Sequence, residues 1–198
     1  ITMSRLTKLP PEQWDPELRA MTQADSATVI EQGITRMLAL SPAMAKAAIG
    51  FGAGVTLNRT LPERLIELVR LRVAFHNQCR SCMAIRYQAA ADSVDEGLVC
   101  SLETPEEAPD LAPAEKAAIA FADRFATDHL SITDERFEAL REHFSEAEIV
   151  ELMVHCALYV GMGRLAAVLD MTEELPEVYR KPFGETVTPW ADAPVRVR

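Results

Sequence analysis

The chain has 198 residues, of which 48% are hydrophobic and 25% charged, and this composition is typical of a folded domain with a buried core. Its formal net charge of -10 disfavours nucleic acids and anionic membrane surfaces as partners, and its Lys and Arg residues form no run. No stretch reaches the ~20 uninterrupted apolar residues of a membrane span, and no signal-peptide pattern opens the chain. We therefore expect a cytoplasmic protein.

The spacing of apolar residues predicts an all-α protein. Apolar residues recur at helical intervals across residues 27–169, whereas the period-two alternation of strands never lasts more than a few positions. We treat residues 1–198 as one helical domain, with its core over about 27–171.

Capping signals place three helices in the first half of the chain. Ser26 and the preceding Asp25 can cap the first, and Pro42 suits the first turn of the second. A capping box that begins at Thr60 opens the third, which should end near Asn77, a residue type that tolerates a left-handed backbone. These helices are predicted over residues 27–40, 41–57 and 63–76.

The second half resumes the helical pattern after an acidic loop. Residues 92–113 contain prolines and predict a surface loop with a short helix inside it. Pro113 opens a helix over residues 114–128, and Ser145 begins a second capping box.

The chain becomes irregular over residues 172–198, where four prolines prevent a continuous helix. Trp190 and other apolar residues in this segment favour an arm laid against this subunit or a neighbour. The alternative is a frayed terminus.

A weak internal repeat relates the two halves. It aligns residues 66–69 with residues 150–153 and sets Cys79 and Cys82 against Gly163 and Ala166. We interpret this as two related helical halves, one active and one structural, although any two amphipathic helices look partly alike.

Cys79 and Cys82 form the one pair of reactive side chains at a spacing with chemical meaning. Residues three apart share a helix face, so the two sulfurs can meet in a disulfide. In a reducing compartment such a C-x-x-C pair indicates redox chemistry or a metal site. Zinc normally needs four ligands, and the other candidates, His76, Cys100 and Cys156, are too near or too distant in sequence. Hydrolysis by a Cys–His pair would leave one cysteine unexplained.

Two charged residues could tune this pair. A reactive thiol needs positive potential, and Cys82 should lie in the first turn of a new helix with Arg86 four residues on, on the same face. Glu67 lies in a nearly continuous apolar helix, where burial would raise its pKa and suit it to proton transfer. Glu67 could instead simply pair with Arg70, one turn on.

These residues carry a family resemblance. The pattern E-x11-C-x-x-C formed by Glu67, Cys79 and Cys82, preceded by Leu61-Pro62-Glu63-Arg64, resembles the carboxymuconolactone decarboxylase superfamily and its alkylhydroperoxidase D-like (AhpD-like) branch. The likeness covers about residues 27–171. It implies an AhpD-like helical bundle that assembles as dimers, trimers or hexamers. It also implies that Cys82 is the peroxidatic cysteine, that Cys79 is the resolving cysteine, and that Glu67 belongs to a proton relay.

The chain departs from the branch at two positions. The branch has a histidine four residues after the second cysteine, where this chain has Arg86, and some members have a histidine inside the motif, where it has Ser81. Arginine cannot act as a base at ordinary pH. His76 is the nearest substitute in sequence, unless it binds the last carbonyls of its helix. His155 could approach the site from the second half, or be a satisfied core residue.

We interpret the chain as a thiol-dependent peroxidase or disulfide oxidoreductase that reduces hydroperoxides and is regenerated by an external dithiol or thiol reductant. No cofactor or metal is expected, since no glycine-rich phosphate loop occurs. One alternative is a lyase that acts on a small cyclic substrate, as the lactone decarboxylases do, and the cysteine pair argues against it. Another is an inactive scaffold, which Arg86 and Ser81 favour.

Overall fold

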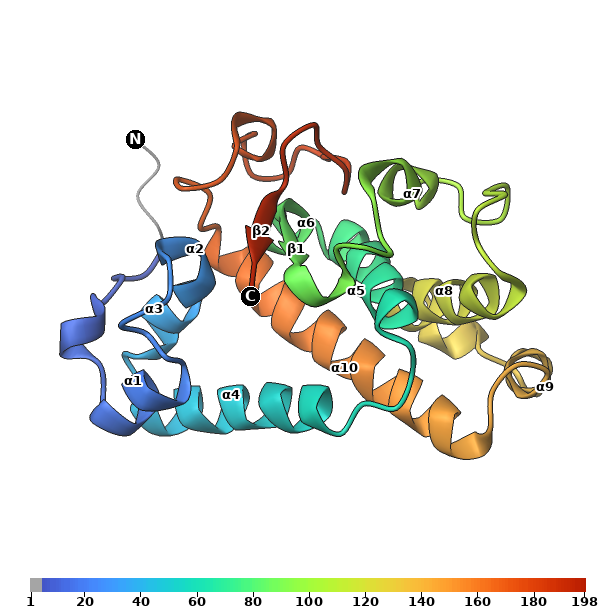
Figure 1. Ribbon diagram of the computed structural model, residues 1–198, viewed down its shortest axis with the longest axis horizontal. Coiled ribbons are helices and arrows are strands. Elements are labelled where there is room, and N and C mark those ends of the chain that lie inside the picture. The colour runs from blue at the N-terminus through green and yellow to red at the C-terminus, as the bar shows by residue number, and fades with distance from the viewer. Residues whose placement is uncertain (1–4) are drawn as a thin grey trace.

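Two long helices, α5 (Glu63–Asn77) and α10 (Glu146–Leu169), form the centre of the computed structural model, which describes residues 5–198. They pack against each other, and α8 (Pro113–Thr127) packs along α5 (Figure 1). The two short strands pair in parallel, with Ile85 opposite Val195. The prediction of an all-α fold is confirmed.

The core is built mainly on α5, because this helix is buried on almost every side. The side chains of Leu68, Val69, Leu71 and Val73 are completely buried. They belong to one cluster with buried residues of α8 and α10, namely Ala118, Ile119, Phe121, Ala122, Ile149, Leu152 and Cys156.

The single helix expected over residues 27–40 is wrong. The chain forms α2 (Val29–Gln32) and α3 (Thr35–Leu38), separated at Gly33, whose φ of +46° breaks the helix. Thr28 caps α2, rather than Asp25 or Ser26. Before them lie η1 (Pro11–Gln13) and α1 (Pro16–Met21), and after them comes α4 (Pro42–Leu57), which begins at the proline as expected.

The second half follows its capping signals. The loop after residue 92 contains the expected short helix, α7 (Glu96–Ser101), and α8 begins at Pro113. Ser145 and Glu148 form the predicted capping box of α10. The remaining elements are α6 (Arg80–Ala84), β1 (Ile85–Tyr87), η2 (Gln88–Ala90), η3 (His129–Ser131), α9 (Asp134–Arg141), η4 (Glu177–Tyr179) and β2 (Val195–Val197).

The start of α5 is capped from α10, so the capping box predicted at Thr60 is wrong. The carboxylate of Glu151 accepts hydrogen bonds from the backbone N–H groups of Thr60 and Leu61, both at 2.9 Å, and from the Thr60 hydroxyl. The residue at the N-cap itself, Pro62, contributes no side-chain hydrogen bond. The two central helices are thereby joined by polar contacts as well as by apolar packing.

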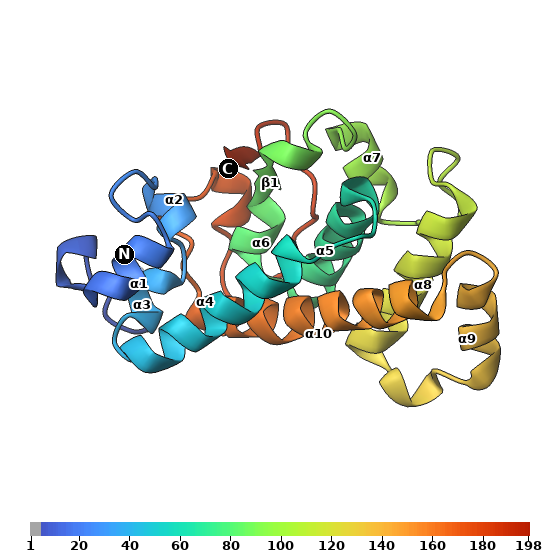
Figure 2. The ribbon, with the colours of Figure 1, turned by 60° about the horizontal axis from the view of Figure 1, so that its bottom comes forward.

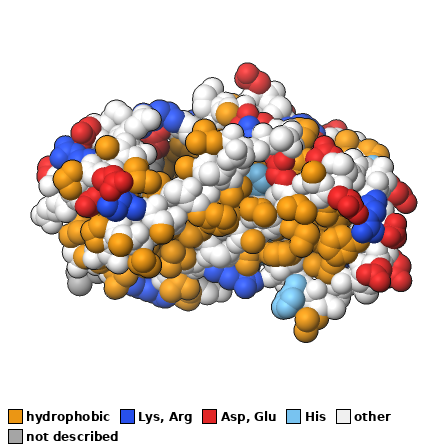
Figure 3. Space-filling model, turned by 90° about the horizontal axis from the view of Figure 1, so that it is seen from below, with side chains coloured by type: hydrophobic (Ala, Val, Ile, Leu, Met, Phe, Trp, Pro, Cys, Tyr) orange, Lys and Arg blue, Asp and Glu red, His pale blue; other side chains and the backbone are white. Residues whose placement is uncertain are grey.

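One face of the molecule is strongly apolar. Helix α4 buries only Ala45 and packs against α1, α3 and part of α10, while Phe51 and Leu57 are exposed (Figures 1 and 2). Figure 3 shows hydrophobic side chains over much of the face on which α4 lies.

Helix α10 is the one helix within residues 5–198 that is long and apolar enough to cross a membrane, by length and composition alone. Part of its apolar surface packs on α5 and α8 in the core.

The C-terminal arm, residues 172–198, is laid against its own subunit, so a frayed terminus is wrong for it. It passes over α6, and β2 pairs with β1 (Figure 1). Tyr179 is completely buried, and its hydroxyl lies 3.3 Å from the carbonyl oxygens of both Met83 and Pro189.

Candidate active site

The cysteine motif lies at a sharp turn between two helices. Helix α5 ends at Asn77, and Gln78 takes the left-handed conformation with φ of +48°, where Asn77 was expected to take it. Cys79 is the N-cap of α6, which starts at Arg80. Cys82 therefore lies in the first turn of a new helix, as predicted.

The two sulfurs are joined in a disulfide, with Cα atoms 5.2 Å apart. Cys79 is completely buried, whereas Cys82 is only partly buried. The backbone N–H of Cys82 lies 3.3 Å from Sγ of Cys79, so the capping interaction of α6 goes to the buried sulfur. Access, rather than the field of this short helix, distinguishes Cys82 as the sulfur that an outside molecule can reach.

Cys82 lines a cavity of about 300 Å³. Gly163 and Ala166, the residues that the repeat sets against the cysteines, line it from α10. Most of the surrounding side chains are apolar, and they come from α2, α3, α5, β1 and α10. They include Ile30, Ile34, Ala74, Ile85, Leu158 and Met162.

Glu67 forms a buried pair with Arg70, which was the simpler of its two interpretations. Nε and Nη2 of Arg70 donate to the two carboxylate oxygens at 2.6 and 2.7 Å. Nη1 donates to the carbonyl oxygen of Cys82 at 2.7 Å, and Nη2 also donates to that of Ile85 at 3.0 Å. Burial acts to lower the pKa of Arg70, but attraction to Glu67 outweighs it and the net shift is upward.

Sequence reasoning did not propose Arg70 as a site residue, although it named the residue as a partner for Glu67. Arg70 binds the backbone carbonyl oxygen of Cys82 in α6 and also lines the cavity there. Its guanidinium lies 5.0 Å from the ring centre of Tyr87, which lines the same cavity. The available signal was an acidic and a basic residue one turn apart on a helix with many apolar positions.

A second cavity, of about 540 Å³, adjoins the first. Glu67 and His155 line it, together with residues of α4 such as Gly52. The two cavities share five lining residues, Arg70, Tyr87, Leu158, Tyr159 and Met162. The wall between them is therefore built from α5, β1 and α10.

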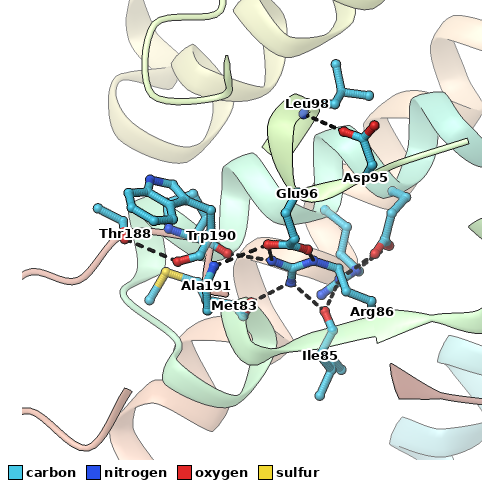
Figure 4. A network of polar contacts seen from close by, with 12 residues as sticks. Met83, Ile85, Arg86, Asp95, Glu96, Leu98, Thr188, Trp190 and Ala191 are labelled. Carbon is cyan, nitrogen blue, oxygen red and sulfur yellow. Dashed lines mark hydrogen bonds and ion pairs between the residues drawn. The ribbon is translucent and has the colours of Figure 1, made fainter. Parts of the chain in front are cut away.

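The expected position of Arg86 beside Cys82 is wrong, because α6 ends at Ala84 and Arg86 lies on the extended strand β1. Its buried guanidinium is bound by both carboxylate oxygens of Glu96, at 2.7 and 3.0 Å, and by the carbonyl oxygens of Met83 and Pro189 (Figure 4). Arg86 lines neither cavity. It joins the motif to α7 and to the C-terminal arm.

His76 is also directed elsewhere. Its Nε2 lies 2.7 Å from Oδ1 of Asp123 on α8, which also receives two hydrogen bonds from Arg72. Burial opposes ionisation of Asp123, but these two partners outweigh it and hold its pKa below the usual range. His76 lines neither cavity, so it is wrong as the substitute for the missing histidine.

His155 lies on α10 and is 1% exposed. Its Nδ1 is 3.2 Å from the hydroxyl of Tyr159. Its Nε2 is the one buried side-chain nitrogen or oxygen in the described part of the chain without a hydrogen-bond partner, and Oε1 of Glu151 is 3.8 Å away. Burial lowers the pKa of His155, partly offset by Glu151. His155 is thus only half satisfied, unlike an ordinary core histidine.

The C-terminal arm forms hydrogen bonds with residues at and beside the cysteine motif. No local sequence pattern could have indicated these contacts. Arg80, inside the motif, is buried and donates to carbonyl oxygens of Lys181, Pro182 and Glu185. The amide of Gln78 donates to the carbonyl oxygen of Val187 at 3.2 Å and accepts from its N–H at 2.8 Å. Both ends of the turn are therefore fixed by residues about a hundred positions later.

Other candidate ligands are not gathered at this site. Within residues 5–198, no three His, Cys, Asp or Glu side chains are grouped so as to hold a metal ion. Cys100 is exposed, and Cys156 is buried, which raises its pKa to about 12.

Comparisons with known proteins confirm the resemblance. Residues 42–124 match the model of the carboxymuconolactone decarboxylase family. None of the curated proteins matches the chain significantly.

Three solved structures share the fold. One is an alkylhydroperoxidase AhpD core, a peroxidase-related protein from Ralstonia eutropha JMP134, with 19% identity and a TM-score of 0.67 over 84% of this chain and 90% of that one. Another is a protein from Agrobacterium tumefaciens proposed to be the antioxidant defence protein AhpD. It has 25% identity and a TM-score of 0.62 over 70% of this chain and 96% of that one. The third is an alanine variant of the debrominase Bmp8 bound to 2,3,4-tribromopyrrole. It has 18% identity and a TM-score of 0.68 over 85% of this chain and 91% of that one.

Proposed function

Because residues 42–124 belong to the carboxymuconolactone decarboxylase family, we propose that this chain is a thiol-dependent peroxidase that uses Cys79 and Cys82. One observation carries the proposal. The two sulfurs are within bonding distance, and only Cys82 lines the cavity, while Cys79 is buried behind it. This is the arrangement that a peroxidatic and a resolving cysteine need.

The proposed cycle has three steps. The thiolate of Cys82 attacks the terminal oxygen of a hydroperoxide, the O–O bond breaks, and the alkoxide takes up a proton to leave as an alcohol. The sulfur of Cys79 then attacks Cys82 in its sulfenic acid form, and the hydroxyl leaves with the Cys79 proton as water. An external dithiol or thiol reductant reopens the disulfide and is itself oxidised.

The buried pair of Glu67 and Arg70 has two roles in this proposal. Arg70 fixes the carbonyl of Cys82, so the reactive sulfur stays at the cavity wall. The carboxylate of Glu67 lines the second cavity, where it can take part in proton transfer as the family resemblance implies.

The test follows the thiols directly. Fully reduced protein should consume one equivalent of hydroperoxide, after which alkylation and intact mass should show that two thiols are lost and that a dithiol restores them. A variant with Cys100 and Cys156 replaced by Ala should behave in the same way. If Cys79 and Cys82 both remain alkylatable after excess peroxide, the proposal is wrong.

The apolar cavity favours one other use of the same thiol pair. Bmp8 shares the fold and is a debrominase, and a ring-sized apolar molecule suits the lining of the Cys82 cavity. Incubation of reduced protein with 2,3,4-tribromopyrrole, with bromide release as the readout, tests this. Release of bromide without peroxide consumption would replace the peroxidase proposal. The lyase alternative gives neither product, since it uses no thiol pair.

We also propose that the chain forms a homo-oligomer through α4. Two copies with a formal net charge of -10 repel each other except across a face with few charges, and α4 has Lys46 as its only charged residue. Met44, Phe51 and Leu57 are 64%, 50% and 83% exposed, which leaves this face without a partner inside the subunit. Light scattering should give a mass well above 21.9 kDa, and Phe51→Glu should lower it. A mass of one chain at micromolar concentration would contradict the proposal.

A further inference from the structure

Tyr159 is the hydroxyl-bearing residue of α10 at the wall between the two cavities. It lines the Cys82 cavity and also the larger cavity that contains Glu67 and His155. Arg86, which occupies the position of the missing histidine, and His76, its nearest substitute in sequence, line neither. Glu67 lines only the larger cavity, so none of the groups assigned above lies in the Cys82 cavity to move protons at Cys82.

Three polar residues lie at successive four-residue steps of α10 and lead to this wall. Glu151, His155 and Tyr159 share one face of the helix because residues four apart are neighbours. The Glu151 carboxylate is fixed by Thr60 and Leu61 at the start of α5 and lies 3.8 Å from Nε2 of His155. Nδ1 of His155 lies 3.2 Å from the Tyr159 hydroxyl.

The charge states of these groups suit a relay. Burial lowers the pKa of His155, which favours the neutral imidazole and leaves one ring nitrogen free to accept a proton. Burial raises the pKa of Tyr159, against a smaller effect of Arg70, so the phenol keeps its proton at neutral pH. A hydrogen on Nε2, on the side of the Glu151 carboxylate, makes Nδ1 the acceptor for the Tyr159 O–H.

We propose that Tyr159 passes protons between Cys82 and the substrate, with His155 as the residue that stores the proton and Glu151 as the residue that orients His155. This inference rests on the proposed peroxidase function. The Cys82 thiol gives its proton to the oxygen of Tyr159, whose own proton passes to Nδ1 of His155.

The same route runs in reverse when the peroxide bond breaks. The Cys82 thiolate takes the terminal hydroxyl and becomes a sulfenic acid, and the leaving alkoxide takes a proton from Tyr159, which recovers one from His155. Thiol and hydroperoxide thus become sulfenic acid and alcohol, with no proton taken from solvent. The relay performs the task of the histidine that is absent at Arg86.

The test uses the leaving group to separate proton transfer from structural damage. Tert-butyl hydroperoxide leaves as a basic alkoxide that needs a proton, whereas peracetic acid leaves as acetate, which does not. Tyr159→Phe should lower kcat/KM for tert-butyl hydroperoxide by about 10² to 10⁴-fold. Its loss on peracetic acid should be much smaller. His155→Leu should show the same bias. His155→Asn should show it too, because its amide keeps a polar atom near Nδ1 but cannot take up a proton.

Each contrary outcome has a separate meaning. If wild-type protein consumes neither peroxide, the proposed function is wrong. If wild-type protein is active and Tyr159→Phe keeps the wild-type ratio of the two rates, or lowers both rates equally, the relay is wrong. If Tyr87→Phe changes the ratio of the rates on the two peroxides and Tyr159→Phe does not, then Tyr87 rather than Tyr159 transfers the proton and the relay is wrong. Thermal unfolding of each variant confirms that it is folded.

Discussion

Helices α5 and α10 are the counterparts that the weak sequence repeat aligns, and they differ most at the position that matters for chemistry. Helix α5 stops at Asn77, turns through Gln78 and restarts with the cysteine motif. Helix α10 continues through the matching residues, Gly163 and Ala166, to Leu169. One helix breaks to present a sulfur, and the other stays whole to form the facing wall of the same cavity.

The unbroken helix α10 comes very close to the end of α5 at Gly163. A Cβ atom at Gly163 would lie 2.5 Å from Nδ2 of Asn77, the last residue of α5. That amide donates to the carbonyl oxygen of Tyr159 and its oxygen accepts from Arg164, so the end of α5 is bound to α10. The two halves are thus specialised rather than duplicated, one for reactive groups and the other for shape and, as proposed here, proton transfer.

The largest expected effect tests whether all sulfur chemistry belongs to the broken helix. Cys82→Ser should lower peroxide turnover by about 10⁴-fold or more, because no other cysteine lines the cavity. Cys79→Ser should allow one oxidation and stop at a sulfenic acid on Cys82, detectable by intact mass after trapping. Faster alkylation of Cys79 than of Cys82 in reduced protein would reverse the two roles.

The second test concerns the residue that follows the motif. Arg86→Ala should destabilise the protein by about 2–3 kcal/mol, because it leaves Glu96 and two buried carbonyl oxygens without their charged partner. Arg141→Ala, at an exposed arginine paired with Glu138, should change stability by less than about 0.5 kcal/mol. Urea unfolding measures both.

Arg86→His sharpens the same point. From the sequence alone, this change restores the family residue and should keep or raise turnover. In the structure, imidazole cannot reach Glu96, Met83 and Pro189 together, so we expect a loss of stability close to that of Arg86→Ala. Higher turnover in Arg86→His with unchanged stability would contradict this description of Arg86.

A smaller effect tests the close approach of the unbroken helix. Gly163→Ala gains about 1 kcal/mol of helix propensity but forces Asn77 out of its hydrogen bonds, at a cost of about 1–3 kcal/mol, so a net loss near 1 kcal/mol is expected. Gly161→Ala, two residues earlier with open space around the new Cβ, should gain about 0.5–1 kcal/mol. Equal melting temperatures would show that the approach is not tight.

The smallest expected effect is a loss of stability at low pH when Glu31 is protonated. The backbone N–H of Thr28 and the charged side chain of Arg198 hold the pKa of Glu31 at about 2, below its ordinary value of 4.5. Because the folded value is the lower one, the stabilisation by Glu31 is complete above about pH 4.5 and is lost as the pH falls towards 2. The protection of the β2 amides against hydrogen exchange, after correction for the intrinsic pH dependence of exchange, should fall over that window, and Glu31→Gln should remove the dependence. Unchanged protection between pH 5 and 3 would contradict the link.

Much of the fold could be predicted because many of its helices begin at residues that are recognisable from the local sequence. Pro42, Pro113 and the Ser145 capping box mark helix starts that depend only on neighbouring residues. The break at Gly33 also has a local signal, a glycine inside a helical pattern, but the apolar spacing by itself continues across it.

The site was less predictable because its geometry depends on distant contacts. The cysteine pair could be found from spacing, but the position of Arg86 was inferred by extending α6 beyond Ala84. Glu151 caps α5 from α10, and His76 binds Asp123 on α8, and neither contact has a local signal. The i,i+4 relation of His155 to Tyr159 was available, but nothing local indicated that this face of α10 meets the cavities.

The contacts that hold Arg80 also set an order of events during synthesis. The carbonyl oxygens that bind it come from residues 101 to 105 positions later in the chain. At about 5–20 residues per second, a ribosome reaches them roughly 5–20 s after the cysteines have been added. For that interval the thiols are present without the segment that fixes their turn, and they are open to mispairing or to oxidation by passing disulfides. A cell that makes this protein under oxidative stress would therefore risk damage to the nascent chain at the two cysteines that we propose reduce the oxidant.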